Sequence, residues 1–200
     1  MSRPTDRKPL YRETALAAML VLLITGCRFW IDTPNFQPVM AVALFAGMVF
    51  SRRWLGMVTV LSGMLMSDLL LGSYQWQVML AVYLAVGSPL LLAWWIRRGN
   101  LGTGRRFLLL TGSSVGSAIL FYIVTNLAVW GFSGWYPTTP GGLVSCLTMG
   151  LSFFKWTLAS NLVFAGMLFG GQALPGLLSG WRLAARCPHP VPVTAGRRLR

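Results

Sequence analysis

Acidic side chains are scarce in this sequence, which has only 4 Asp and Glu residues among 200. Charged residues of both signs make up 10% of the chain, whereas soluble proteins carry roughly 25%. Hydrophobic residues make up 55%. This balance excludes an ordinary soluble domain and predicts an integral membrane protein, all-α because its apolar runs have the lengths of helices.

Histidine and cysteine are equally scarce. The single histidine, His189, lies in a basic tail, so a Ser-His-Asp triad or a histidine-liganded metal site cannot be assembled. Cys27, Cys146 and Cys187 are too dispersed for a disulfide framework or a metal cluster. No glycine-rich phosphate loop with Lys-Ser or Lys-Thr occurs. We therefore predict no enzyme activity, no metal and no cofactor, and expect any ATP-driven step to come from a partner chain.

Basic residues dominate, with 17 Lys and Arg giving a net charge of +13. Such an excess in a soluble chain would suggest a nucleic-acid partner. The sequence shows no basic patch with interleaved aromatic residues, however, and basic residues collect in the cytoplasmic loops of membrane proteins. We therefore expect the lipid bilayer, and not nucleic acid, as a partner.

Six apolar runs predict a bundle of about six transmembrane helices over 14–171. The runs cover residues 14–25, 39–50, 55–71, 78–96, 107–130 and 156–171. The second run is shorter than the roughly 20 residues that cross a bilayer. We expect it to be extended by Phe36 and Gln37, to lie in a thinned bilayer, or to be partly re-entrant. The moderately apolar segment 143–154 predicts an extra interfacial or re-entrant helix before the last span.

The positions of the basic residues predict the orientation. Four lie in the arm 1–13, two in the second loop, four in the fourth loop and five in the proline-rich tail 172–200, which is 15 of the 17. The other two are Arg28, in an outer loop, and Lys155, at membrane depth. The positive-inside rule then places both termini in the cytoplasm.

Two short motifs allow more than one interpretation. Residues 24–27, Ile-Thr-Gly-Cys, resemble a bacterial lipobox, but we favour an uncleaved first helix. Gly112 and Gly116, with Ser113 and Ser117, give the fifth span a small-residue face that permits close helix approach. We expect this face to pack within the bundle, with a dimer contact as the alternative.

Asp68 is the last acidic residue of the chain and lies inside the third apolar run. A carboxylate in hydrocarbon costs roughly 2.5 to 3.5 kcal/mol on insertion scales, so it should face a protein interior or a wet cavity. One hypothesis pairs it with Lys155, which also has apolar neighbours. The alternative is that Asp68 lies near a helix end and is hydrated.

Several polar and aromatic residues lie near the predicted outer face, where they could bind a small molecule. The candidates are Asn35, Phe36, Asp68, Asn126, Trp130, Trp135, Tyr136, Lys155 and Asn161. The predicted site lies at the outer ends of the third, fifth and sixth spans, under a loop over 131–142. Alternatively, the asparagines only bond across helices and the aromatic residues only anchor the protein among lipid headgroups.

An ordered set of motifs resembles a family of uncharacterised bacterial multi-pass membrane proteins. The motifs are PNFQPV (34–39), ALFAG (43–47), MSDL (66–69), TNLAVW (125–130), WYPTT (135–139), GGL (141–143) and FFK (153–155). That family is in turn similar, more distantly, to the substrate-binding S components of energy-coupling-factor vitamin transporters. Relatives tend to have Asn-Thr followed by an acidic residue, whereas this chain has Trp156, Thr157 and then Asn161.

The resemblance implies a solute-binding component for a small, vitamin-like ligand, working with an ATP-driven module of other chains. A second interpretation is a non-transporting membrane scaffold or morphogenesis subunit, in which the polar residues only hold helices together. An intramembrane enzyme is the weakest of the three, since no nucleophile or acid-base pair is evident. The sequence does not name the ligand.

Overall fold

The computed structural model of the chain describes residues 9–72, 75–99 and 101–184. Within these ranges the chain forms helices and no strand, which confirms the all-α prediction. The helices are α1 (Leu10–Trp30), α2 (Val39–Val49), α3 (Arg53–Leu71), α4 (Trp76–Arg98), α5 (Thr103–Phe132) and α6 (Pro140–Ala184). Each predicted apolar run corresponds to a helix or to part of one.

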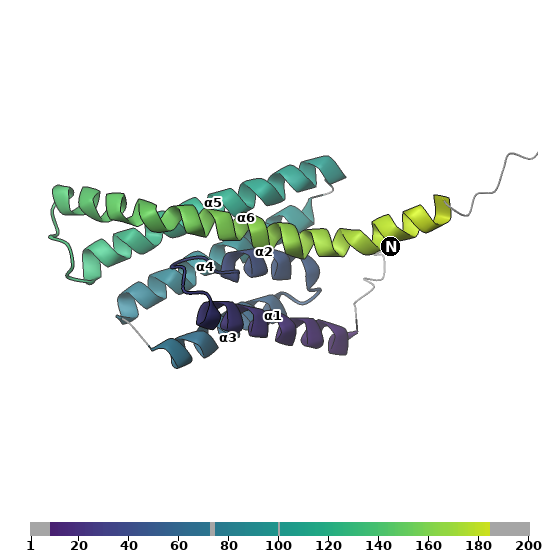
Figure 1. Ribbon diagram of the computed structural model, residues 1–200, viewed down its shortest axis with the longest axis horizontal. Helices are drawn as coiled ribbons and strands as arrows, with labels where there is room; N and C mark the ends of the chain where they lie inside the picture. The colour runs from purple at the N-terminus through teal and green to yellow at the C-terminus, as the bar shows by residue number, and fades with distance from the viewer. Residues whose placement is uncertain (1–8, 73–74, 100, 185–200) are drawn as a thin grey trace, which may run out of the picture.

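The helices lie along the long axis of the molecule, with α2 in the middle (Figure 1). α1 lies beside α3, and α5 lies beside α6. Successive helices run in opposite directions, so the bundle has two distinct ends. We call one the arginine end, defined by Arg12, Arg52, Arg53, Arg97, Arg98, Arg105 and Arg106. We call the other, where α1, α3 and α5 finish, the far end.

Five helices are long and apolar enough to cross a membrane: α1, α3, α4, α5 and the first 32 residues of α6. α2 is the exception, because its 11 residues extend only about 16 Å at 1.5 Å per residue. Its residues 39–47 are nevertheless all buried, since α3, α4, α5 and α6 surround it. α2 therefore forms the core of the bundle although it is half the length of a span.

The structure decides how the short second span is accommodated. The helix begins at Val39, and the connection 31–38 is not helical. Phe36 and Gln37 therefore do not extend α2 as helix. Irregular backbone at membrane depth is tolerated where protein surrounds it or where it lines a cavity. The far half of the second span is such a segment.

Close packing of α2 on α4 depends on a glycine. A Cβ at Gly47 would lie 2.6 Å from Cβ of Ala93 and 3.1 Å from the carbonyl oxygen of Leu90. Gly63 has the same role between α3 and α1, because a Cβ there would lie 2.9 Å from Cδ1 of Ile24. Both contacts let helix backbones approach closely, as small residues do in membrane bundles.

α6 differs from the sequence-based prediction. The expected separate helix over 143–154 and the last span over 156–171 are parts of one continuous helix of 45 residues. Pro140 occupies its first position, where a proline is favoured. No proline lies between 141 and 171 to break it, and Lys155 is accommodated as an exposed side chain. The helix also continues past 171 as far as Ala184, whereas 185–200 lie outside the described residues.

The small-residue face of α5 is divided. Ser117 is buried, but Gly112 and Gly116 are exposed, and a Cβ at either would have no atom within 4 Å. The prediction that these two glycines pack against a neighbour within the bundle is therefore wrong. The packing glycines are Gly47 and Gly63, in other helices.

Replacing Gly47 with alanine should destabilise the protein, because the added methyl group would push α2 away from α4. Over-packing of a core typically costs 1–3 kcal/mol. Gly112→Ala is the matched control and should be neutral or slightly stabilising, since alanine is the better helix former by about 1 kcal/mol. Thermal unfolding of the detergent-solubilised protein measures both, and equal melting temperatures for the two variants would contradict the close α2–α4 contact.

Candidate ligand-binding site

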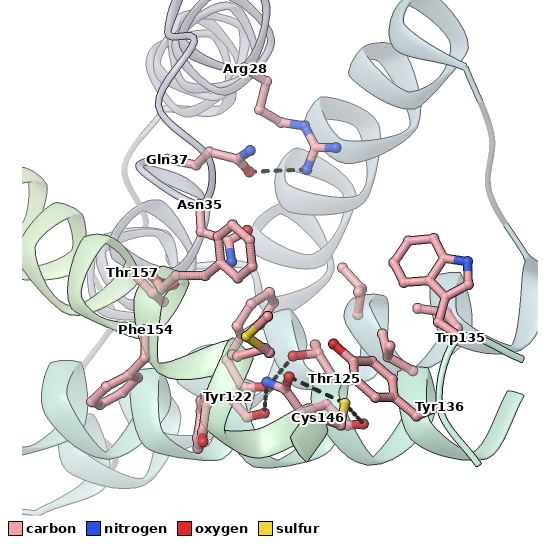
Figure 2. A pocket seen from close by; sticks show the side chains of 18 residues that line it. Arg28, Asn35, Gln37, Tyr122, Thr125, Trp135, Tyr136, Cys146, Phe154 and Thr157 are labelled. Atoms are coloured by element: carbon pink, nitrogen blue, oxygen red, sulfur yellow. Dashed lines mark hydrogen bonds between the residues drawn. The ribbon is translucent and has the colours of Figure 1, made fainter. Parts of the chain in front are cut away.

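A cavity of about 350 Å³ occupies the far half of the bundle, beyond the N-terminus of α2 (Figure 2). Its walls come from the end of α1, the α1–α2 connection, α4, α5, the α5–α6 connection and α6. A smaller chamber of about 30 Å³ adjoins Val39 and Met40 and shares Arg28, Asn35 and Gln37 with the large one. The cavity is thus the space that the short α2 leaves unfilled.

Two kinds of side chain line the cavity. The polar side chains, which can form hydrogen bonds, include Arg28, Asn35, Gln37, Thr125, Asn126 and Thr157. The aromatic groups are Phe121, Tyr122, Trp135, Tyr136, Phe153 and Phe154. An aromatic lining with a few placed polar groups is typical of small-molecule sites.

Arg28 is the charged group of the lining, and residues of α3 and of the α1–α2 connection hold its side chain. Its Nη2 donates to Oδ1 of Asp68 in α3 at 2.6 Å, and its Nη1 donates to Oε1 of Gln37 at 3.2 Å. The hydroxyl of Tyr83 in α4 donates to Oδ2 of Asp68 at 2.8 Å. Nη1 also lies 3.1 Å from Sδ of Met64. The guanidinium group is therefore fixed at the cavity wall, with its counter-charge behind it.

Asp68 does not pair with Lys155, so that hypothesis is wrong. Asp68 is 5% exposed and bound to Arg28, so it is not a hydrated helix-end residue either. Lys155 is exposed on α6, with Nζ 5.4 Å from the centroid of the Trp156 ring. The hypothesis failed because α3 packs on α1, α2 and α4, whereas Lys155 belongs to α6.

Asn126 lies on the α5 side of the cavity. Its Nδ2 donates to the backbone carbonyl of Tyr122 at 2.8 Å, and its Oδ1 lies 3.8 Å from Sγ of Cys146 (Figure 2). Gly150 of α6 faces this side chain so closely that a Cβ there would overlap it. A thiol is a weak donor, so Oδ1 of Asn126 keeps capacity to accept a hydrogen bond from a ligand.

The α5–α6 connection forms one edge of the cavity. Trp135 is 79% exposed and Tyr136 is half-buried, which places Trp135 at the mouth. Gly134 has φ of 73°, a conformation that favours glycine, so the connection can turn sharply there. Nε1 of Trp130 donates to the carbonyl of Pro137 at 3.1 Å and ties the connection to the end of α5.

The structure brings four of the nine candidate residues to the cavity: Asn35, Asn126, Trp135 and Tyr136. Asp68 lies behind Arg28, and Trp130 holds the connection without lining the cavity. The third span therefore contributes no lining residue, although the prediction placed the site at its outer end.

The remaining three candidates lie elsewhere. Phe36 packs its ring against Trp156 and Phe164, at centroid distances of 6.3 and 5.8 Å. Asn161 is 1% exposed, and its Nδ2 donates to the carbonyl of Ser114 at 2.9 Å. Asn161 therefore joins α5 to α6, as the alternative interpretation expected, and Lys155 faces outward.

Sequence reasoning missed Arg28 and Gln37. Arg28 was assigned to an outer loop, whereas it lies in the last turn of α1 and its side chain is only 11% exposed. A signal was available, because Arg28 is the one basic residue of the predicted outer loops and Asp68 the one acid of the third run. Two isolated opposite charges near the same membrane depth are expected to form an ion pair.

Five helices able to cross a bilayer, with a buried ion pair between α1 and α3, define a multi-pass membrane protein. The chain belongs to DUF6580, a family of unknown function whose model matches residues 8–179. This agrees with the resemblance to an uncharacterised membrane-protein family. No curated protein and no solved structure matches the chain.

Breaking the pair of Arg28 and Asp68 should be strongly destabilising. Asp68→Asn or Arg28→Met leaves one buried charge without its partner, which costs about 3–5 kcal/mol, whereas the double change should cost less than the sum. Lys155→Met is the control and should change the melting temperature little, because Lys155 is exposed. Additive losses in thermal unfolding of the two single variants would show that the residues act independently.

Proposed function

We propose that this protein binds a small solute in the cavity at the far end and acts as the solute-binding component of an uptake system. The observation that carries the proposal is the cavity itself, whose volume of about 350 Å³ falls within the 300–1,000 Å³ usual for ligand sites. An ATP-driven module from other chains would supply the energy. The protein would lie in a bacterial inner membrane.

The polar end of the cavity indicates which part of a solute it would hold. Arg28 and the N-terminus of α2 meet at the smaller chamber. Arg28, whose charge Asp68 balances, presents N–H donors there, and the helix N-terminus adds roughly half a positive charge. Hydrogen-bond acceptors of a solute would lie there. Half-length helices in membranes commonly point their N-termini at acceptor groups in this way.

The aromatic side chains would hold the body of the solute. Trp135 and Tyr136 come from the α5–α6 connection, and Phe121 and Phe153 come from α5 and α6. Flat rings offer a large contact area at small conformational cost. A vitamin-like molecule, with a ring system and acceptor groups at one end, suits both parts of the cavity.

The resemblance to S components adds support from the sequence. It runs through the uncharacterised membrane-protein family, and four motifs that resemble that family, 34–39, 125–130, 135–139 and 153–155, contribute residues to the cavity wall. The departure from the family pattern ends at Asn161, which bonds to Ser114 and is not part of the lining. Thr157, which lies within the departing segment, does line the cavity.

Solute binding is tested by a screen of vitamins and their precursors against the purified protein, measured by isothermal calorimetry. Asn126→Ala and Trp135→Ala should each weaken the binding of a hit about tenfold, because the first removes one hydrogen bond and the second removes one stacking surface. Trp76→Ala is matched to Trp135→Ala, because Trp76 is also an exposed far-end tryptophan but lies outside the cavity.

The controls decide between the functions. If a hit binds equally well to both cavity variants, or if Trp76→Ala weakens it as much as Trp135→Ala, the assigned site is wrong. If the full screen gives no hit and no solute co-purifies, the scaffold or morphogenesis function is favoured instead. The polar network would then serve only to hold the helices together.

Orientation is tested separately. We propose that the arginine end faces the cytoplasm, as the positive-inside rule requires. A cytoplasm-active reporter fused after Gly99 should be active, and the same reporter after Gly134 should be inactive, because α5 separates the two positions. Identical signals would exclude this topology.

A further inference from the structure

A groove of about 490 Å³ lies at the arginine end, between the end of α4 and the start of α5. Its lining is amphipathic. The apolar part comes from Trp95, Ile96, Leu101 and Leu109, and the charged part from Arg98 and Arg105. Trp95 is 64% exposed, so an apolar surface accompanies the two cations.

The arginines of this end differ in what they contact. Arg52 pairs with Glu13 at 3.4 Å, and Arg53 lies 5.5 Å from the centroid of the Trp94 ring. Arg97 donates to the carbonyl of Phe50 at the end of α2. These three therefore have roles within the protein.

Arg98, Arg105 and Arg106 are different. Across residues 9–72, 75–99 and 101–184, none of their side chains has a hydrogen bond or an ion pair. All three are exposed. Three uncompensated cations beside an apolar groove form a surface with an excess of positive charge.

The first turn of α5 adds to this charge. Gly102 precedes the helix and has no side chain to cap it. The first backbone N–H groups of α5, beside Arg105, are therefore free to donate hydrogen bonds. The partial positive charge of a helix N-terminus then adds to the field of the two guanidinium groups. The groove thus matches an anion that carries an apolar chain.

We propose that this groove binds an anionic phospholipid of the surrounding leaflet. The phosphate would lie between Arg98 and Arg105, since guanidinium groups match phosphate geometry. An acyl chain would follow Trp95 and Leu109 toward the bilayer centre. Basic pockets between helices at this membrane depth are suited to such headgroups. The proposal is independent of the solute cavity, which lies at the other end.

Titration of the full-length protein in detergent with phosphatidylglycerol or phosphatidylcholine, followed by native mass spectrometry, tests this site. Phosphatidylglycerol should bind more tightly than phosphatidylcholine. Arg98→Gln and Arg105→Gln should each weaken phosphatidylglycerol about fivefold, and the double variant on the order of 25-fold. Both positions are exposed, so the melting temperatures of the three variants should not change.

Arg106→Gln is the matched control, because it removes the same charge from the next residue, which does not line the groove. Its affinity for phosphatidylglycerol should stay within about twofold of that of the unsubstituted protein, since a screened charge outside the site contributes little. An equal loss for Arg105→Gln and Arg106→Gln would mean that only general surface charge attracts the lipid, and the site would be wrong.

Two further results would also overturn the proposal. Equal binding of both lipids would show that the groove recognises acyl chains alone. Inorganic phosphate that displaces phosphatidylglycerol at millimolar concentration would show that the arginines form a site for a free anion. Retention of the lipid in excess phosphate supports the assignment.

Discussion

The structure depends on a constraint that hydrocarbon imposes on α2: backbone polar groups at membrane depth must be satisfied within the protein. α2 has only 11 residues, so its N-terminus lies inside the bundle while its C-terminus reaches the arginine end. At its C-terminus, Arg97 donates to the carbonyl of Phe50, and Glu13 accepts from the N–H and hydroxyl of Ser51 at 2.7 and 2.6 Å. At its N-terminus, the non-helical connection and the cavity take the place of the missing turns. The length of α2 therefore determines where the cavity lies.

Acidic residues are few, and the two buried ones each have a defined place. Glu13 holds the turn between α2 and α3 at the arginine end, and Asp68 neutralises Arg28 near the far end. Because Arg28 is paired inside the bundle, it adds no free positive charge to the far end. The difference in free positive charge between the arginine end and the far end is thus larger than the numbers of basic residues indicate. Lys155, exposed on α6, can keep its ammonium group solvated through its long aliphatic stem.

The helices could be predicted from the sequence because each apolar run is a local signal. The shortness of the second run also indicated an irregular segment, and four of the candidate residues, Asn35, Asn126, Trp135 and Tyr136, line the cavity. The contacts between helices could not be predicted in the same way. Pairing Asp68 with Arg28 instead of Lys155 required knowing that α3 packs on α1 and not on α6, which apolar periodicity does not encode. The same lack of neighbour information misplaced Gly112 and Gly116.

The charge arrangement at the cavity limits the solutes that suit it. Arg28 lies at the wall while Asp68 lies behind it, so the pair presents donors to the cavity without a net charge. A neutral or zwitterionic solute with acceptor groups could use these donors, and the buried charge would stay balanced. A fully ionised solute would leave one uncompensated charge in a low-dielectric site, which is costly. Tyr83 and Gln37 fix the pair from α4 and the α1–α2 connection, so little conformational freedom is left to lose on binding. The short α2 and the pre-ordered ion pair therefore favour an uncharged polar solute over an anion.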